Sequence, residues 1–217
     1  MEIHDIKEVS DEVLRILDKL MNRDCQPGKF SLLKIKQLAK NTDILYIIEE
    51  DPVYFLLLDR FDKHKTVYIH DVCASKKHRG RGVFKQSIEF LKKYYSKKGF
   101  KNFTLDASDS TKEAGLNQKA RIHIFHSSGF DINTETGLFN KSGEYSIIKT
   151  IVLLDNGETV EIQKKTGDKY SVKNKSGKEY SVTIEQIEKC FDSDGNQISC
   201  PMIMKIPKAR KRKTSKK

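Results

Sequence analysis

The segment from Val67 to Phe84 constrains the fold more than any other part of the chain. An apolar run rich in β-branched residues ends at Ala74, and a basic turn with glycines at positions 80 and 82 follows it. Beyond the turn, apolar side chains recur at helical spacing, at positions 84, 88, 91 and 95. Because the period changes from strand to helix inside the segment, we predict a strand, a turn and a helix that begins near Gly82.

A helix start of this kind is suited to holding a phosphate group. Its first amides have no partner within the helix and carry a partial positive charge. Glycines at 80 and 82 let the main chain approach a ligand where a Cβ atom would collide, and Arg79 and Arg81 supply fork-shaped donors. The alternative is a basic surface turn that only caps a helix. The chain has no P-loop motif, and Lys85 stands where a dinucleotide-binding loop has its third glycine.

The turn resembles the central motif of the GNAT superfamily of acyl-CoA-dependent N-acetyltransferases, which reads Arg/Gln-x-x-Gly-x-Gly/Ala after a strand. Residues 79–84 match this motif except at the last position, where Phe84 replaces a small residue. Phe84 shares the helical stripe with Ile88, so we expect it to point into the core. The resemblance implies that Arg79, Gly80, Arg81, Gly82 and Val83 hold the pyrophosphate of acetyl-CoA. It also implies that Val72, Cys73 and Ala74 pair with the pantetheine arm as an added strand does.

The order of predicted elements also resembles the GNAT fold, over residues 1–150. We expect strand, two helices, three strands, helix, strand, helix and two strands, which is one mixed-sheet α/β (α+β) domain. The strand at Phe103–Ala107 follows a crossover helix, so we predict that it is parallel to, or splayed from, the strand that ends at Ala74. The last two strands are predicted at residues 130–134 and 145–152.

A second family motif, Asn-x-x-Ala-x-x-x-Tyr-x-x-x-Gly-Phe, is matched only in part near Gly129. Counting back from this glycine places Phe125 at the tyrosine position, and Asn117 lies one residue out of register with the asparagine. In the family the tyrosine often protonates the leaving thiolate, a reaction for which Phe125 has no hydroxyl. We expect Phe125 to be a core residue, and we place Asn117 and Phe125 near the coenzyme.

Amine acetylation needs a proton acceptor, because only about one alkyl amine in a thousand is unprotonated at neutral pH. His70 and Asp71 lie in the central strand where family members often carry an acid, and Asp106 lies on the next strand. His70 is our first choice because imidazole titrates near neutrality. The alternative for each of these three residues is a structural hydrogen bond or ion pair.

The sequence indicates neither a metal site nor a disulfide framework. The four cysteines form no Cys-x-x-Cys pair, so we predict reduced thiols and read Cys73 as a small buried apolar residue. His123 and His126 lie one helical turn apart, but we interpret them as surface residues.

Residues 151–201 have a different sequence pattern, in which short runs of alternating apolar and polar residues are separated by glycine-containing hairpin turns. This spacing predicts a small all-β module that is weakly similar to Tudor-like or KOW-like barrels. The alternatives for its role are that it binds a peptide or nucleic acid, covers the acetyltransferase domain or mediates self-association. We predict that residues 202–217 form a disordered basic tail. The net charge of +11 arises mostly there, because the first 201 residues hold 33 basic and 30 acidic side chains.

We therefore expect an N-acetyltransferase that moves the acetyl group of acetyl-CoA to a primary amine, with no metal cofactor. The alternatives are an acyl-CoA-binding scaffold without activity and a nucleic-acid-binding protein that uses the basic tail. No signal peptide or membrane-spanning run is apparent, so we expect a cytoplasmic protein, or a nuclear one if the tail acts as a targeting signal. The acceptor, whether small molecule or protein, and the oligomeric state stay open.

Overall fold

A seven-stranded sheet forms the centre of the molecule. The computed structural model describes the whole chain except residues 26–30, 109–115, 134–137, 140–144, 147–149 and 207–217. The strand order is β1-β2-β3-β4-β5-β15-β6. The strands are β1 (Glu2–Asp5), β2 (Thr42–Ile48), β3 (Pro52–Phe61), β4 (Thr66–Ala74), β5 (Asn102–Ala107), β6 (Asp131–Ile132) and β15 (Cys200–Lys205).

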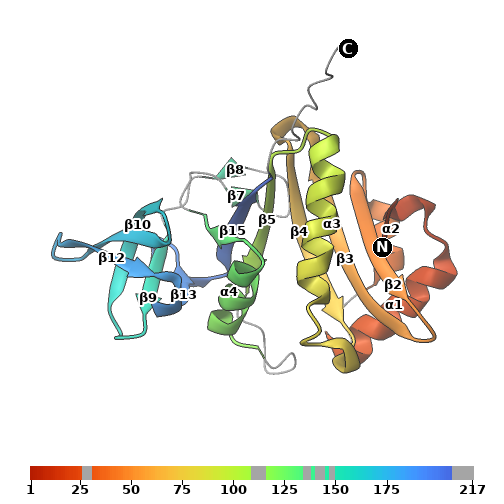
Figure 1. Cartoon of the computed structure of the whole chain (residues 1–217), viewed down its shortest axis with the longest axis horizontal. Coiled ribbons are helices and arrows are strands. Elements are labelled where there is room, and N and C mark those ends of the chain that lie inside the picture. Colours follow the sequence, from red (N-terminus) through yellow and green to blue (C-terminus); the bar gives the residue numbers. More distant parts are fainter. Residues whose placement is uncertain (26–30, 109–115, 134–137, 140–144, 147–149, 207–217) are drawn as a thin grey trace, which may run out of the picture.

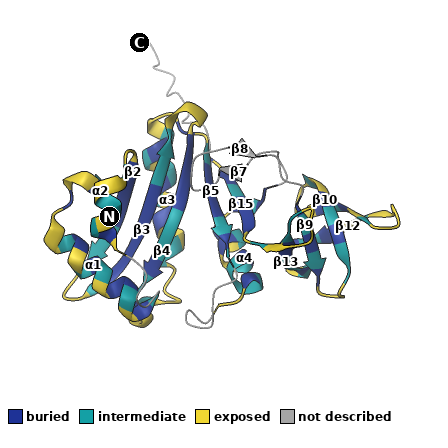
Figure 2. Ribbon diagram, turned by 180° about the vertical axis from the view of Figure 1, so that it is seen from behind, coloured by how far each residue is buried: buried dark blue, intermediate teal, exposed yellow. Residues whose placement is uncertain are grey.

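Helices cover both faces of this sheet (Figures 1 and 2). The helices are α1 (Asp11–Asp24), α2 (Leu32–Leu38), α3 (Val83–Lys97) and α4 (Gln118–Ser127). Helix α1 begins where predicted, because the Ser10 hydroxyl accepts a hydrogen bond from the amide of Val13. Its apolar stripe packs with Phe55 and Leu57 of β3, whereas Ile88 and Leu91 of α3 belong to the core on the opposite face.

Strands β4 and β5 run parallel for only three residue pairs and then part. The pairs join Thr66–Tyr68 to residues 102–104, and no backbone pair joins the two strands beyond Tyr68 within the described residues. The predicted parallel or splayed arrangement is therefore confirmed in both respects. As a result, the carboxyl-terminal half of β4 presents an unpaired edge toward β5 (Figure 1).

A β-bulge in β4 lies where the strands part. Leu57 of β3 pairs with Asp71, and the next residue, Leu58, pairs with Ile69. His70 is therefore an extra residue, and side chains change faces there. Val67 and Ile69 before the bulge, and Val72 and Ala74 after it, all pack into the α3 core.

The last strand of the sheet is not the predicted one. We expected residues 145–152 to complete the sheet, but β15 takes this place and lies between β5 and β6. Tyr145–Ser146 instead pairs with Leu138–Phe139 in a separate two-stranded sheet. The predicted tail boundary at Met202 is also wrong, since Met202 and Met204 are buried in β15. The basic residues from Lys208 onward lie outside the described residues.

A second sheet connects β6 to β15. Its order is β12-β11-β10-β9-β13-β14, with two free ends, so the predicted barrel-like closure is not seen in the described chain. Its strands are β9 (Ile151–Leu154), β10 (Thr159–Thr166), β11 (Lys169–Asn174), β12 (Glu179–Thr183), β13 (Ile187–Phe191) and β14 (Gln197–Ile198). Figure 1 shows this sheet beyond α4 and β15 at one end of the molecule.

Buried polar side chains attach the second sheet to the first. The Gln118 amide donates to the carbonyls of Ala107 and Ile198 and accepts from the amide of Cys190. The Tyr170 hydroxyl accepts from the amide of Ile132. Because Gln118 and Tyr170 are almost fully buried, these bonds are costly to leave unmade. In addition, the buried apolar side chains of the two sheets form one continuous core.

The expectation of reduced cysteines is wrong for this structure. Cys25 is joined to Cys73, with Cα atoms 6.0 Å apart, and Cys190 is joined to Cys200, with Cα atoms 5.1 Å apart. No local sequence pattern indicates the first bond, because its partners lie 48 residues apart and meet only when α1 packs beside β4. Among the described helices, none is long and apolar enough to cross a membrane.

Candidate active site

The turn between β4 and α3 leaves its main chain exposed. Gly80 and Gly82 are exposed and have φ angles of 75° and 74°, the left-handed region that favours glycine. A Cβ atom added at either glycine would meet no protein atom within 4 Å. Gly82 caps α3 without a side-chain hydrogen bond. The first amides of α3 therefore lie beside an open, glycine-lined turn, as a phosphate cradle requires.

The positive charge around this turn is local. Six basic or imidazole side chains occupy positions 76–85, and no acid occurs between Asp71 and Glu89. Within the described residues, the Arg81 guanidinium has no hydrogen bond or ion pair. Val83 is the first residue of α3 and packs partly into the core. The exposed Arg81 side chain is thus available for an anionic ligand.

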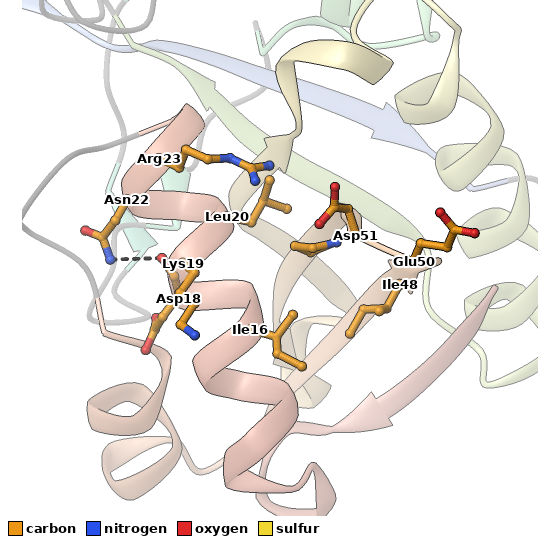
Figure 3. A pocket seen from close by; sticks show the side chains of 10 residues that line it. Ile16, Asp18, Lys19, Leu20, Asn22, Arg23, Ile48, Glu50 and Asp51 are labelled. Atoms are coloured by element: carbon orange, nitrogen blue, oxygen red, sulfur yellow. Dashed lines mark hydrogen bonds between the residues drawn. The ribbon is translucent and has the colours of Figure 1, made fainter.

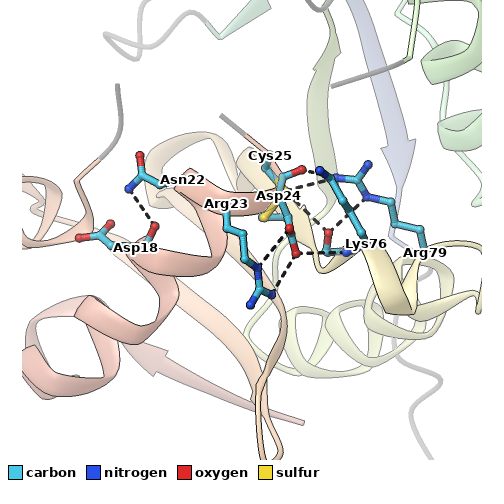
Figure 4. Close-up of a disulfide and its surroundings, with 9 residues drawn as sticks. Asp18, Asn22, Arg23, Asp24, Cys25, Lys76 and Arg79 are labelled. Carbon is cyan, nitrogen blue, oxygen red and sulfur yellow. Dashed lines mark hydrogen bonds and ion pairs between the residues drawn. A yellow bond between two sulfur atoms is a disulfide. The ribbon is translucent and has the colours of Figure 1, made fainter. Parts of the chain in front are cut away.

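The Arg79 side chain has a structural role in this state. Its guanidinium donates to the carbonyl oxygen of Asp24 at the end of α1 and, over 3.4 Å, to the carbonyl oxygen of Ala74. Figure 4 shows Arg79 reaching across to the end of α1, beside the Cys25–Cys73 disulfide. Of the two predicted phosphate-binding guanidinium groups, Arg79 holds the turn in place and Arg81 projects from it.

Asp24 joins the same contact from the other side (Figure 4). Its buried carboxylate accepts hydrogen bonds from the Arg23 guanidinium, at 3.0 Å and 3.2 Å, and from the Lys76 amide, at 3.1 Å. Burial by itself raises the pKa of Asp24, but the bonds from Arg23 and Lys76 outweigh it, so the pKa lies below its ordinary value. The end of α1 is thereby fixed to the start of the glycine turn.

Val72, Cys73 and Ala74 lie on the unpaired edge of β4. Each pairs with β3 on the other side, Val72 with Leu56 and Ala74 with Tyr54. Val72 and Ala74 pack against the α3 core, whereas Cys73 is fully buried on the opposite face in its disulfide. The edge that faces β5 has the main-chain groups of an open strand, so an extended ligand can pair there.

The three predicted catalytic residues gather around Tyr68, a residue that the sequence analysis did not single out. The Tyr68 hydroxyl donates to the Asp106 carboxylate over 2.7 Å. Nδ1 of His70 lies 2.6 Å from a carboxylate oxygen of Asp71, and the His70 ring stands edge-on to the Tyr68 ring at 6.1 Å. His70, Asp71 and Asp106 therefore lie where β4 and β5 part, with Tyr68 at the last paired position.

The Tyr68 phenol stays protonated. Burial raises the pKa of Tyr68 well above its ordinary value, and the negative charge of Asp106 raises it further. Tyr68 is therefore a permanent hydrogen-bond donor to Asp106 at physiological pH.

Asn117 and Phe125 have structural roles in helix α4. The Asn117 side chain caps α4 by accepting from the Ala120 amide at 2.9 Å. Phe125 is only 8% exposed and packs against Phe84 and Phe130, with ring centres 5.4 Å and 6.4 Å away. Phe84 points inward as predicted, so the large residue at the end of the cradle motif fills the core instead of the turn.

His123 and His126, interpreted as surface residues, are half-buried. His126 Nδ1 lies 3.3 Å from Asp131, and both histidines contribute to the lowered pKa of Glu185, whose largest cause is a hydrogen bond with Thr183. Asp131 lies in β6 and Glu185 lies in the helical turn between β12 and β13, so sequence spacing gave no sign of these carboxylates. The residues that the structure describes contain no cluster of three metal-ligating side chains.

A separate hollow of about 790 Å³ lies between α1 and the turn that joins β2 to β3 (Figure 3). Apolar side chains of Ile16, Leu20 and Ile48 line its floor, with Arg23, Glu50 and Asp51 around it. None of the predicted site residues lines this hollow, so it is distinct from the site between β4 and β5.

Comparison with known proteins agrees with this geometry. Residues 11–130 match the family model described as the acetyltransferase (GNAT) family. No curated protein matches the chain in sequence. Among solved structures, the ribosomal-protein-S18-alanine N-acetyltransferase from Escherichia coli is 11% identical, with a TM-score of 0.52 and 97% of each chain covered. The aminoglycoside 6'-N-acetyltransferase from Enterococcus faecium is 10% identical, with a TM-score of 0.56 and coverage of 97% of this chain and 100% of that chain.

At such low identity the solved structures show a shared fold and no more. Parted parallel strands that precede an open glycine turn are the arrangement that the sequence resemblance implies for an acetyltransferase fold. The family match covers more than half of the chain. The protein belongs to the GNAT acetyltransferase family.

Proposed function

We propose that this protein is an N-acetyltransferase that transfers the acetyl group of acetyl-CoA to a primary amine. The observation that carries the proposal is the parting of β4 from β5 directly before the glycine turn at residues 80–82. In this proposal the turn and the first amides of α3 hold the diphosphate, and Arg81 adds a cationic contact. The open edge at residues 72–74 pairs with the pantetheine arm and aligns the thioester.

The residues around Tyr68 supply the chemistry in this proposal. His70, oriented by Asp71 at 2.6 Å, accepts a proton from the acceptor ammonium, directly or through water. The neutral amine nitrogen attacks the thioester carbonyl, so a C–N bond forms and the C–S bond breaks. Main-chain amides at the bulge of β4 stabilise the oxyanion. As the amide forms, its nitrogen loses a second proton, which the departing CoA thiolate takes up, so that the one proton released overall is the one that His70 accepted.

A second candidate function rests on Phe125. Its side chain is buried among Phe84 and Phe130 and has no hydroxyl that can protonate a thiolate. A scaffold that binds acyl-CoA without turning it over would also need the cradle but no proton donor at this position.

Release of CoA thiol in the presence of a panel of amines separates these two functions. The panel contains a polyamine, an aminoglycoside, a lysine peptide and a peptide with a free N-terminus. We expect thiol release with at least one amine, and we expect His70→Gln to lower kcat about 100-fold or more, with unchanged acetyl-CoA affinity. Acetyl-CoA binding without thiol release for any amine would favour the scaffold.

A further inference from the structure

Tyr68 and Asp106 occupy the junction at which β4 and β5 separate. Tyr68 pairs with Thr104 in the last backbone pair between the strands, and Asp106 lies two residues further along β5. Phe103 and Leu105 face the α3 core, as do Val67 and Ile69. By strand alternation, Tyr68 and Asp106 therefore share the opposite face of the sheet. Their hydrogen bond of 2.7 Å links the strands where the backbone ladder ends.

The carboxylate is more accessible than the phenol that holds it. Tyr68 is 4% exposed, whereas Asp106 is half-buried. The buried phenol keeps its proton, so it donates its hydrogen bond to the Asp106 carboxylate at the edge of the opening. Asp59 and Asp71 also lie close enough to Tyr68 to raise its pKa.

Charge is distributed unevenly along the parted strands. The glycine turn at one end carries Lys76, Lys77, Arg81 and Lys85 without an acid. The junction around Tyr68 carries Asp59, Asp71 and Asp106 with His70 beside them, and the Arg121 guanidinium of α4 donates to Ser108, two residues beyond Asp106. A ligand that spans this distance is best matched if its anionic part lies at the turn and a cationic part lies at the junction.

We infer that Asp106 receives the ammonium group of the acceptor and that Tyr68 is the positioning residue that orients the Asp106 carboxylate. The inference rests on the proposed function and specifies how the amine binds. The cationic form of the amine docks at Asp106, and its proton then passes to the His70–Asp71 pair. A singly charged primary amine is sufficient for this contact.

Tyr68→Phe tests this inference, with Tyr95→Phe as the matched control. Tyr95 is also a buried tyrosine that donates to a buried aspartate, over 2.6 Å to Asp43, but it lies on α3 and packs against Phe103 on the face of the sheet opposite Tyr68 and Asp106. Both variants lose one buried hydrogen bond, so both should lose stability. With the best amine from the thiol-release panel, we expect Tyr68→Phe to raise the KM for amine about tenfold. We expect no change in acetyl-CoA affinity, and Tyr95→Phe should leave both quantities unchanged.

A second comparison separates positioning from general loosening of the site. Asp106→Asn should raise the amine KM at least as much as Tyr68→Phe, and the double variant should be no worse than Asp106→Asn alone, because Tyr68 acts through Asp106. An unchanged KM in Tyr68→Phe, an equal rise in Tyr95→Phe, or additive effects in the double variant would overturn the inference while the enzyme stays active. Acetyl-CoA binding with no amine turnover in the wild type would overturn the proposed function and this inference with it.

Discussion

At the scale of single residues, two side chains hold the glycine turn to the end of α1. The Arg79 guanidinium donates to the carbonyl oxygen of Asp24, and the Asp24 carboxylate accepts from the Lys76 amide over 3.1 Å.

Asp24 provides a stability test at this scale. Its pKa is depressed in the folded protein, so its contribution is present above its ordinary pKa of 3.8 and is lost as the pH falls through the folded value. We expect Asp24→Asn to lower the free energy of unfolding by about 1–3 kcal/mol at pH 7, the range for hydrogen bonds to a buried charged group. The variant should also show a weaker loss of stability below pH 4, measured by urea unfolding at several pH values.

Asp11 is the control for this prediction. It also has a lowered pKa, mainly because of its hydrogen bond with Lys36, but its side chain is 56% exposed. Because solvent screens an exposed ion pair, Asp11→Asn should change stability little at pH 7. Equal effects of the two substitutions would show that Asp24 does not fix the end of α1 to the turn.

Only the local part of the site could be predicted from sequence. Gly80, Gly82 and the start of α3 follow from a short stretch of sequence, because positive φ angles and a helix start are local properties. Tyr68 was missed because its partner Asp106 lies 38 residues away and a tyrosine in an apolar strand reads as core. The role of Arg79 was missed for the same reason, since the carbonyl of Asp24 lies 55 residues away.

At the scale of elements, the order of strands and helices up to β6 follows from periodicity, and the last strand does not. The apolar residues at 202–204 directly precede the basic run, so we assigned them to the tail. When a strand from a distant part of the chain inserts into the middle of a sheet, its sequence shows only a short apolar run and does not reveal which strands it pairs with. Here the second sheet separates β15 from its neighbour β6 by almost seventy residues, so pairing could not be judged from proximity.

Truncation tests the place of β15. A chain that ends at Ser199 lacks the buried side chains of Cys200, Met202 and Met204 and the ladder between β5 and β6. Losing two buried methionines alone costs about 4–10 kcal/mol, comparable with the whole stability of a typical domain. We expect this chain to lose its cooperative thermal transition, measured by circular dichroism.

A chain that ends at Ile206 is the matched control, because it keeps β15 and the hydrogen bond from the Ile206 amide to Lys101. Its Tm should equal that of the full chain. If the chain ending at Ser199 melted at the same temperature as this control, β15 would not be an essential strand of the sheet.

At the scale of the whole molecule, two disulfides connect separate elements of the fold. The Cys25–Cys73 bond closes a loop of 48 residues and joins α1 to β4, whereas Cys190–Cys200 closes a loop of 10 residues and joins β13 to β15. Sequence spacing alone could not reveal either bond. The shared core and the buried Gln118 amide also join the two sheets, and only the folded structure shows these contacts.

The two disulfides should differ in their effect on stability. A longer closed loop restricts the unfolded chain more, so replacing Cys25 and Cys73 with alanine should cost about 3–4 kcal/mol and replacing Cys190 and Cys200 about 2–3 kcal/mol. Urea unfolding of both double variants, with and without reductant, measures these costs. A wild-type midpoint that reductant leaves unchanged would contradict the contribution of both bonds.

The central claim is that the main chain at residues 80–83 holds the diphosphate of acetyl-CoA, and calorimetric titration of Gly82→Ala with acetyl-CoA tests it most directly. Gly99, at the other end of α3, is the matched control: its φ angle is 82° and an added Cβ atom would likewise meet no protein atom within 4 Å. Each substitution should cost about 1–2 kcal/mol of stability, because alanine disfavours the left-handed region. We predict that Gly82→Ala raises the Kd for acetyl-CoA at least about tenfold, roughly the loss of one good hydrogen bond to a charged group, and that Gly99→Ala leaves it unchanged. Equal affinity of wild type and Gly82→Ala would contradict the claim.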